Sequence, residues 1–243
     1  MVYVPQILDR ALREEGAALK TCVIITTYNE AKRIGELIKQ IRSQDLDVLV
    51  IDDGSNDNTA LIAEENGATV LRNQKNEGKG ASLIKGFHYV LSKDFAAVIT
   101  MDGDGQHIAE DIPYFMRLAK YSDSGILVGN RMHKPKNMPL VRMLTNRAMS
   151  SLISKIVGQK IPDTQCGFRL IKKEILEKLE LKTRNYEIET EVLIKASRLG
   201  FKIESVAIKT IYKGEKSQIN PFVDALRFIR FISKELWTTR RQD

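Results

Sequence analysis

Short apolar runs rich in β-branched residues alternate with amphipathic segments along the chain, and this alternation restricts the fold more than any other feature. The apolar runs cover residues 22–27, 47–52, 68–72 and 96–102, and helical spacing covers about 30–43, 59–66 and 80–91. Strands that alternate with helices in this way form parallel sheets with helices packed on their faces. The sequence therefore predicts an α/β fold with a mostly parallel central sheet flanked by helices.

The second half of the chain is less regular. It suggests a strand over residues 125–131, helices over 139–157 and 189–199, a strand over 202–208 and an amphipathic C-terminal helix from residue 221. Residues 1–20 are typical of a short helix. No apolar run approaches the ~18 residues that a membrane-spanning helix needs, so we expect a chain that does not cross a membrane. The two cysteines lie far apart and no secretory leader precedes them, which indicates the reducing cytoplasm.

Acidic residues follow two of the predicted strands. Asp102 and Asp104 flank a glycine, so an extended backbone points both carboxylates to one side, as Mg²⁺ or Mn²⁺ requires. Gly103 between them permits close approach of a ligand. Asp52 and Asp53 end another strand, where they can accept hydrogen bonds from a nucleobase or ribose. Because ligands of open α/β sheets bind beyond the carboxyl ends of the strands, we expect these groups in one site.

A glycine-containing loop at residues 76–80 enters a helix and offers Lys79 and backbone amides to a phosphate. Its spacing is not that of a P-loop, and no strand is followed by a dinucleotide-binding fingerprint. These absences disfavour ATPases of the P-loop type and dehydrogenases.

The net charge of +7 is local. Residues 124–162 contain seven basic residues and no acidic one, and the remaining 31 basic residues balance the 31 acidic ones. A block of one sign indicates an anionic partner or a solvated basic face. Within it, residues 139–157 carry a helical apolar stripe interleaved with Arg142, Arg147 and Lys155, which suits a membrane surface or packing on the core.

Six segments, in this order, carry a resemblance to a known family: TTYNE, DDGSNDNT, NEGKG, MDGDGQH, VGNR and DTQCGFR. They resemble family 2 glycosyltransferases of the dolichyl-phosphate mannose synthase (polyprenyl-phosphate glycosyltransferase) type over about residues 21–220. The resemblance implies a GT-A fold, a nucleotide-sugar donor and inverting transfer to a polyprenyl phosphate. It divides the chain into an N-terminal helical extension (1–20), a GT-A domain (21–220) and the C-terminal helix (221–243). Within that domain, a nucleotide-binding half covers about 21–130 and an acceptor half about 131–220.

The resemblance also implies roles for individual residues. For the nucleotide sugar we expect Thr27, Tyr28, Glu30, Asp52, Asp53, Lys79, Asp102 and Gly103. For a divalent metal, Mg²⁺ or Mn²⁺, we expect Asp102, Asp104 and Gln106. For catalysis we expect Asp104, Arg131, Asp163 and Glu189. For the acceptor and its phosphate we expect Arg131, Arg169, Lys213, Lys216 and Ser217. The last three lie in a segment, IYKGEKS, that departs from the family's pattern.

The expected reaction is a single displacement at the anomeric carbon, with the metal as Lewis acid for the departing diphosphate. A phosphate acceptor, with a second pKa near ~6, is already ionised and needs little help from a base. A hydroxyl acceptor, soluble or on a protein or polysaccharide, needs one, and Asp163 or Glu189 would be the candidates. We expect GDP- or UDP-sugar donors and peripheral association with the cytoplasmic face of the membrane.

A basic nucleic-acid-binding module without enzymatic activity is the alternative from another class. Aromatic residues make up only 7% of the chain, and no RNA-binding signature is present. We therefore expect no nucleic-acid partner.

Overall fold

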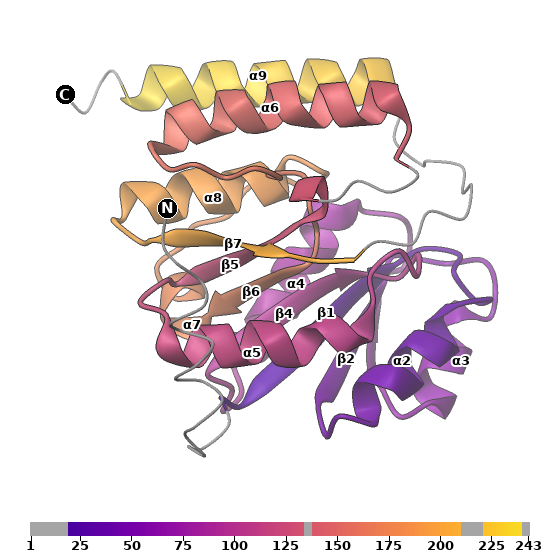
Figure 1. Cartoon of the computed structure of the whole chain (residues 1–243). Coiled ribbons are helices and arrows are strands. Elements are labelled where there is room, and N and C mark those ends of the chain that lie inside the picture. The colour runs from indigo at the N-terminus through magenta and orange to yellow at the C-terminus, as the bar shows by residue number, and fades with distance from the viewer. Residues whose placement is uncertain (1–18, 134–137, 210–220, 240–243) are drawn as a thin grey trace.

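A computed structural model describes residues 19–133, 138–209 and 221–239 (Figure 1). The helix predicted within residues 1–20 lies almost wholly outside the described residues, as do Lys213, Lys216 and Ser217. The predicted division into domains stays a prediction.

One seven-stranded sheet forms the centre of the protein, in the order β3-β2-β1-β4-β6-β5-β7. Its strands are β1 (Thr21–Thr27), β2 (Asp47–Asp52), β3 (Thr69–Arg72), β4 (Ala97–Asp102), β5 (Ile126–Asn130), β6 (Arg169–Lys172) and β7 (Ile203–Ala207). All pairs are parallel except those of β6, which runs antiparallel to β4 and to β5. The predicted mixed α/β fold with a mostly parallel sheet is confirmed.

Helices cover both faces of this sheet. They are α2 (Ile34–Arg42), α3 (Thr59–Glu65), α4 (Lys79–Leu91), α5 (Ile112–Tyr121), α6 (Leu140–Val157), α7 (Lys173–Leu176), α8 (Ile188–Arg198) and α9 (Pro221–Thr239), with short 3₁₀ turns at Ala109–Asp111 and Arg131–His133. Helices α4 and α5 lie on opposite faces of the sheet, and α6 and α9 lie beyond α8 on the same side of the molecule (Figure 1).

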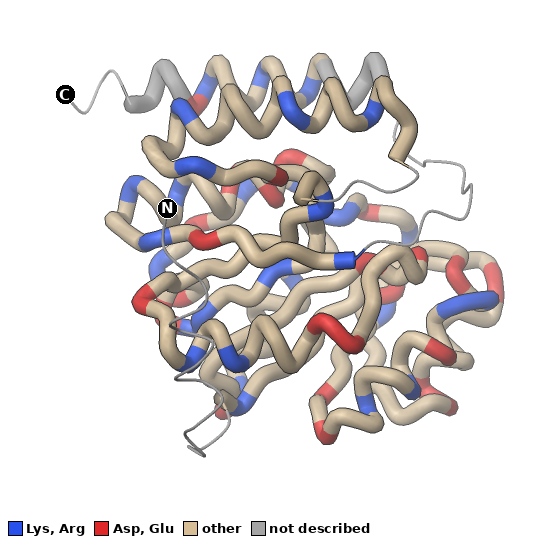
Figure 2. Tube along the Cα trace, in the orientation of Figure 1, with Lys and Arg blue, Asp and Glu red and all other residues tan. Residues whose placement is uncertain are grey.

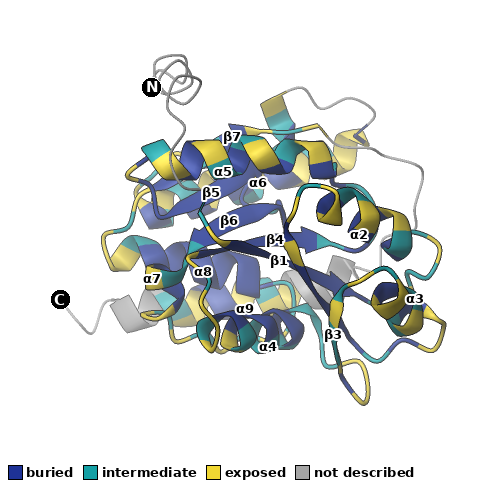
Figure 3. Cartoon of the chain, turned by 90° about the horizontal axis from the view of Figure 1, so that it is seen from below, coloured by how far each residue is buried: buried dark blue, intermediate teal, exposed yellow. Residues whose placement is uncertain are grey.

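Burial follows the amphipathic patterns of the sequence. All seven residues of β1 are buried, and α2 buries Ile34, Leu37, Ile38 and Ile41 at helical spacing. Figure 3 shows buried central strands and helices whose outward faces are exposed. Because β1 has neighbours on both edges and helices on both faces, it reads as a continuous apolar run, as buried parallel strands do.

The structure differs from the sequence predictions in one helix start and adds elements that were not predicted. Helix α2 begins at Ile34, four residues after the predicted start, because Asn29 adopts a positive φ of 57° and the chain turns before the helix. Helix α5 was missed. Residues 168–176, to which the sequence assigned no element, contain strand β6 and the short helix α7, and the extended Lys172 ends β6 directly before α7.

Helix α6 faces the core with a side that the apolar stripe did not predict. Its buried residues are Asn146, Ser150, Ile153 and Val157. Most of the predicted stripe is exposed, with Leu140 71% and Leu144 62% accessible. Within the described residues, no helix is long and apolar enough to cross a membrane.

Candidate active site

The carboxyl ends of three central strands bring the predicted donor residues together. In the parallel register Thr27 of β1 lies opposite Asp52 of β2, and Thr26 lies opposite Asp102 of β4. The convergence of these strand ends at one edge is therefore as the sequence predicts.

The loop after β1 is tied to the loop after β2. The backbone N–H of Asn29 donates to Ser55 Oγ (2.8 Å), and that of Glu30 donates to Thr59 Oγ1 (2.9 Å). In return, Asn56 N–H donates to Asn29 Oδ1 (2.8 Å). These bonds satisfy backbone donors that precede α2 and fix Tyr28 and Glu30 relative to the end of β2.

Asp53 organises the loop that precedes α4. Its carboxylate accepts from the backbone N–H groups of Glu77 and Gly78, each at 2.9 Å, and from Asn73 Nδ2 at 2.8 Å. Gly78 has a φ of +97°, which favours glycine, and a Cβ there would lie 2.4 Å from the carbonyl oxygen of Arg184. Asp53 therefore shapes the loop that presents Lys79.

Asp52 is fully buried at the end of β2. Its Oδ2 lies 3.1 Å from Arg72 Nε, and its Oδ1 accepts from the hydroxyl and backbone N–H of Ser55. Asp52 is thus held by its own turn and by the end of β3.

A cluster of opposite charges connects α4, β4 and α8. Lys79 Nζ lies 2.5 Å from Asp102 Oδ1 and 2.6 Å from Glu189 Oε1. Burial opposes the charged ammonium, but Asp102 and Glu189 outweigh it and raise the pKa of Lys79. Burial likewise opposes ionisation of Asp102, yet Lys79 and then His107 hold its pKa below the usual range. Lys79 and Asp102 are therefore both charged at neutral pH.

His107 and Gly167 close the other sides of Asp102. His107 Nε2 lies 3.6 Å from Asp102 Oδ2, and the buried imidazole packs edge-on against Phe168. A Cβ at Gly167 would lie 2.6 Å from Asp102 Oδ2 and 3.1 Å from Lys79 Nζ. The backbone at residue 167 therefore approaches the cluster as only glycine allows.

Asp104 supplies a second carboxylate beside Asp102. Burial and the Asp102 carboxylate both raise the pKa of Asp104, and its Oδ1 accepts from the backbone N–H of Gln106 at 2.9 Å. Two like charges in this setting suit a divalent cation, which would relieve their repulsion. Among the described residues no three His, Cys, Asp or Glu side chains group to hold an ion. Two carboxylates are oxygen ligands of the kind that Mg²⁺ or Mn²⁺ takes, and phosphate oxygens and water would have to supply the remaining positions.

Arg131 and Asp163 form a buried ion pair. Asp163 Oδ2 accepts from Arg131 Nε (2.7 Å) and from its backbone N–H (3.0 Å), while Oδ1 accepts from an Arg131 terminal nitrogen (2.9 Å). Asn146 of α6 donates to the same Oδ1 at 2.8 Å. Burial opposes ionisation of Asp163, but the bonds from Arg131 hold its pKa below the usual range. Asp163 has no exposed surface and Arg131 is 7% exposed.

Arg169 is buried among backbone carbonyls. It donates to the carbonyl oxygens of Cys166 (2.8 Å), Thr164 (2.9 Å) and Glu189 (2.5 Å). It thus joins the segment before β6 to the first turn of α8, and its predicted contact with the acceptor stays a prediction.

The predicted site residues lie in two groups, each joined by contacts among its members. The ends of β1, β2 and β4 gather the donor and metal residues, and Lys79 joins them to Glu189. Arg131 and Asp163 form the second group, under α6. Two further residues were not predicted: Asn73, which donates to Asp53, and Asn146, which donates to Asp163. Asn73 directly follows β3, so the expectation that ligand-binding residues follow the carboxyl ends of strands could have found it.

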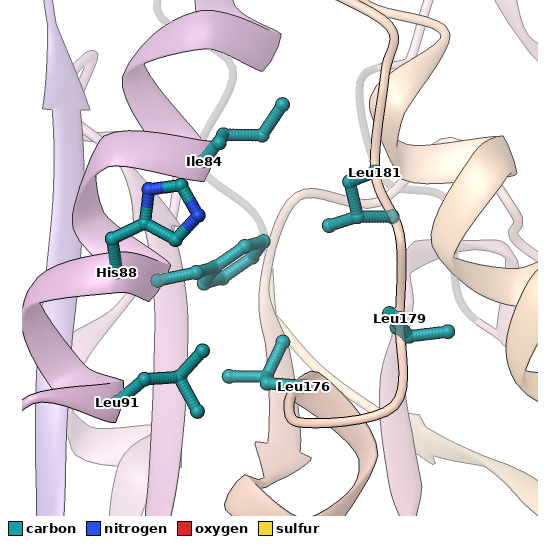
Figure 4. A pocket seen from close by; sticks show the side chains of 7 residues that line it. Ile84, His88, Leu91, Leu176, Leu179 and Leu181 are labelled. Carbon is teal, nitrogen blue, oxygen red and sulfur yellow. The ribbon is translucent and has the colours of Figure 1, made fainter.

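An apolar pocket lies elsewhere, between α4 and the segment from α7 to residue 181 (Figure 4). Ile84, Leu91 and Leu181 are among its lining residues, with the imidazole of His88 beside them. Because the lining contains no carboxylate, guanidinium or ammonium group, it does not suit a metal or a diphosphate.

Comparison with known proteins agrees with this arrangement. Residues 22–180 match the family described as glycosyl transferase family 2. A UDP-N-acetylglucosamine–dolichyl-phosphate N-acetylglucosaminyltransferase of Methanococcus voltae is 32% identical, over 78% of this chain and 85% of that protein. A polyprenol monophosphomannose synthase of Mycolicibacterium smegmatis is 28% identical, over 81% and 82%.

A solved structure shares the fold. The mannosyl-3-phosphoglycerate synthase of Rubrobacter xylanophilus superimposes with a TM-score of 0.73 at 20% identity, over 96% of this chain and 78% of that one. The family predicted from the six motifs is confirmed: this chain belongs to glycosyltransferase family 2.

Proposed function

We propose that this glycosyltransferase transfers a sugar, with inversion, from a nucleotide sugar to a polyprenyl phosphate at the membrane surface. The observation that carries the proposal is that both residues predicted as bases for a hydroxyl acceptor are already engaged. Both carboxylate oxygens of Asp163 accept hydrogen bonds from Arg131, and one of them also accepts from Asn146. Glu189 is ion-paired with Lys79.

An acceptor that is already ionised needs no base. The second pKa of a phosphate monoester, near ~6, leaves its oxygen nucleophilic at neutral pH. A lowered pKa, such as that of Asp163, makes a carboxylate a poor proton acceptor. The names of the relatives support the same acceptor, since they specify transfer to dolichyl phosphate or synthesis of polyprenol monophosphomannose.

The donor would bind at the carboxyl ends of β1, β2 and β4. In our proposal the loop that Asp53 organises offers Lys79 to the diphosphate, near the N-terminus of α4, where anions are favoured. Asp102, Asp104 and Gln106 would hold Mg²⁺ or Mn²⁺, which when bound stabilises the negative charge that develops on the departing diphosphate. GDP and UDP sugars are both candidate donors.

The outer side of α6 and α9 is the surface that we propose for the membrane. Exposed apolar residues recur at helical spacing on both helices: Leu140, Val141, Leu144 and Leu152 on α6, and Leu226 and Ile229 on α9. Arg142, Arg147 and Lys155 are exposed beside the stripe, and α6 carries no acidic residue (Figure 2). Apolar side chains bordered by cations suit the boundary of an anionic leaflet. We place this surface on the cytoplasmic face because both cysteines are free thiols.

Transfer of radiolabelled sugar from UDP- and GDP-sugars, with and without polyprenyl phosphate in vesicles, tests the proposed acceptor. We expect lipid-linked product that requires the phosphate. Donor turnover that ignores the lipid, with the label passing to a soluble hydroxyl compound, would refute it.

Leu144→Glu tests the membrane surface. We expect weaker binding to vesicles containing anionic lipid, with unchanged affinity for the nucleotide, because the substitution places a negative charge in the apolar stripe. Leu61→Glu is the matched control, since Leu61 is an exposed leucine on α3, away from α6 (Figure 1). Equal vesicle binding by both variants would contradict the assignment.

A further inference from the structure

Lys79 occupies one oxygen of Asp102, a carboxylate that the sequence predicts as a metal ligand. Its ammonium lies 2.5 Å from Asp102 Oδ1, and His107 lies 3.6 Å from the other oxygen of that carboxylate. A metal that binds Asp102 at Oδ1 must therefore compete with Lys79. Resting on the proposed donor site, this contact between Lys79 and Asp102 would couple the binding of the metal to the binding of the nucleotide.

The cluster around Lys79 is closely fitted. Lys79 is only 15% exposed, and Glu189, its second partner, is 9% exposed. The Gly167 backbone packs so near that a Cβ would meet atoms of Asp102, Lys79 and Glu189. The ammonium has a carboxylate on either side, so the ion pair with Asp102 belongs to the built site.

Lys79 also stands at the start of α4, on the loop that Asp53 shapes. A diphosphate bound there would offer the ammonium several negatively charged oxygens. A divalent cation beside an ammonium is repelled, and this repulsion falls when phosphate charge lies between them.

We propose that Lys79 is an internal counter-ion of Asp102 that passes to the diphosphate when the metal binds. Without nucleotide, Lys79 neutralises Asp102 and weakens metal binding. With nucleotide, the phosphates draw Lys79 from Asp102 and free the carboxylate for the metal, while Glu189 remains its second partner. Metal and nucleotide each tighten the binding of the other, and by linkage the factor is the same in both directions.

Mn²⁺ binding to the full-length protein, measured from the free Mn²⁺ signal in electron paramagnetic resonance, tests this role. Without nucleotide, we expect Lys79→Met to bind Mn²⁺ about tenfold to a hundredfold more tightly than the unmutated protein, the range of one charge-assisted hydrogen bond. Lys79→Arg keeps the cation and should bind Mn²⁺ as weakly as the unmutated protein. With UDP or GDP present, Lys79→Met should gain less Mn²⁺ affinity from the nucleotide than the unmutated protein does.

Lys195→Met is the matched control. Lys195 pairs with Glu191 at 2.6 Å on α8, about two turns beyond Glu189, and does not contact Asp102. Its loss removes the same charge and the same kind of ion pair, so Mn²⁺ affinity should not change. If Lys79→Met does not fold, Lys79→Gln serves in its place, because it also removes the positive charge beside Asp102 and should likewise bind Mn²⁺ more tightly than the unmutated protein.

Two results separate this inference from the proposed function. Mn²⁺ affinity of Lys79→Met equal to or below that of the unmutated protein, while Asp102→Asn abolishes binding in the presence of nucleotide, overturns the role of Lys79 and leaves the metal site intact. Absence of Mn²⁺ binding in every protein, with UDP and with GDP, overturns the metal site itself and the inference with it.

Discussion

Removal of Arg131 is expected to destabilise the protein strongly, because it leaves a charge buried without its partner. Asp163 has no exposed surface and accepts two side-chain bonds from Arg131, at 2.7 and 2.9 Å. Loss of one member of a buried pair costs about 3–5 kcal/mol, and two charge-assisted hydrogen bonds give a similar sum, about 3–6 kcal/mol. For a chain of this length, a loss of about 3–5 kcal/mol corresponds to a fall in Tm of about 6–20 °C.

Urea unfolding of Arg131→Met at neutral pH measures this loss. Arg184→Met is the matched control, because Arg184 pairs with Glu77 at 2.7 Å with a side chain that is 64% exposed. An exposed pair contributes about 0–1 kcal/mol, so the control should unfold almost as the unmutated protein does. Arg131→Met/Asp163→Asn should recover part of the loss, since no buried charge remains.

The loss should also depend on pH. In the unmutated protein the pKa of Asp163 is lowered, so its contribution is present above the unfolded value of about 3.9 and is lost as the pH falls through the folded value. Without the Arg131 side chain, the largest contribution that opposes burial is lost and the pKa of Asp163 rises, although the bonds from Asn146 and the backbone N–H of residue 131 remain. Protonation on acidification then relieves the buried charge. The difference between the two proteins should narrow as the pH falls from 7 toward 4. A loss under about 1 kcal/mol at neutral pH, or a difference that widens with acid, would refute the reasoning.

Three further outcomes are expected. Gly167→Ala should lower the rate of sugar transfer about a hundredfold, the size of a lost electrostatic contact in a site, because its Cβ would lie 2.6 Å from Asp102 Oδ2; transfer at the unmutated rate would contradict the close approach. Asn146→Ala should lower the free energy of unfolding by about 1–3 kcal/mol, measured in urea, since it removes a buried donor to Asp163. Burial raises the pKa values of Cys22 and Cys166 to about 12, so Ellman's reagent should find no fast-reacting thiol in the native protein and two after unfolding; a fast native thiol would be inconsistent with this burial.

The sequence predicted most of the sheet and the gathering of Asp52 and Asp102 at one edge. Both follow from local patterns, because apolar runs set the strands and parallel pairing places their carboxyl ends together. The six motifs then identified the family. The strand β6 was harder to predict, since its antiparallel pairing depends on strands that lie far away along the chain.

Side-chain partnerships were less predictable for the same reason. The sequence offered Glu189 as a base and Arg131 as a phosphate ligand, but it could not show that each faces an opposite charge, because the pairs Lys79–Glu189 and Arg131–Asp163 join distant segments. Which side of α6 is buried could not be predicted from the sequence either. Asn146 and Ser150 are polar, and they face inward because Asn146 donates a hydrogen bond to Asp163 and Ser150 Oγ accepts one from the backbone N–H of Thr164.

The contact between Lys79 and Glu189 spans 110 positions of the chain, so during synthesis on the ribosome Lys79 emerges long before its partner. A nascent chain that ends before α8 lacks one of the two carboxylates that hold Lys79. Contacts of such separation close late in folding, because the entropy of closing the loop opposes them until neighbouring structure is in place. The charged centre of the enzyme is therefore completed only after most of the sheet has been translated, so incomplete chains carry an unfinished donor site.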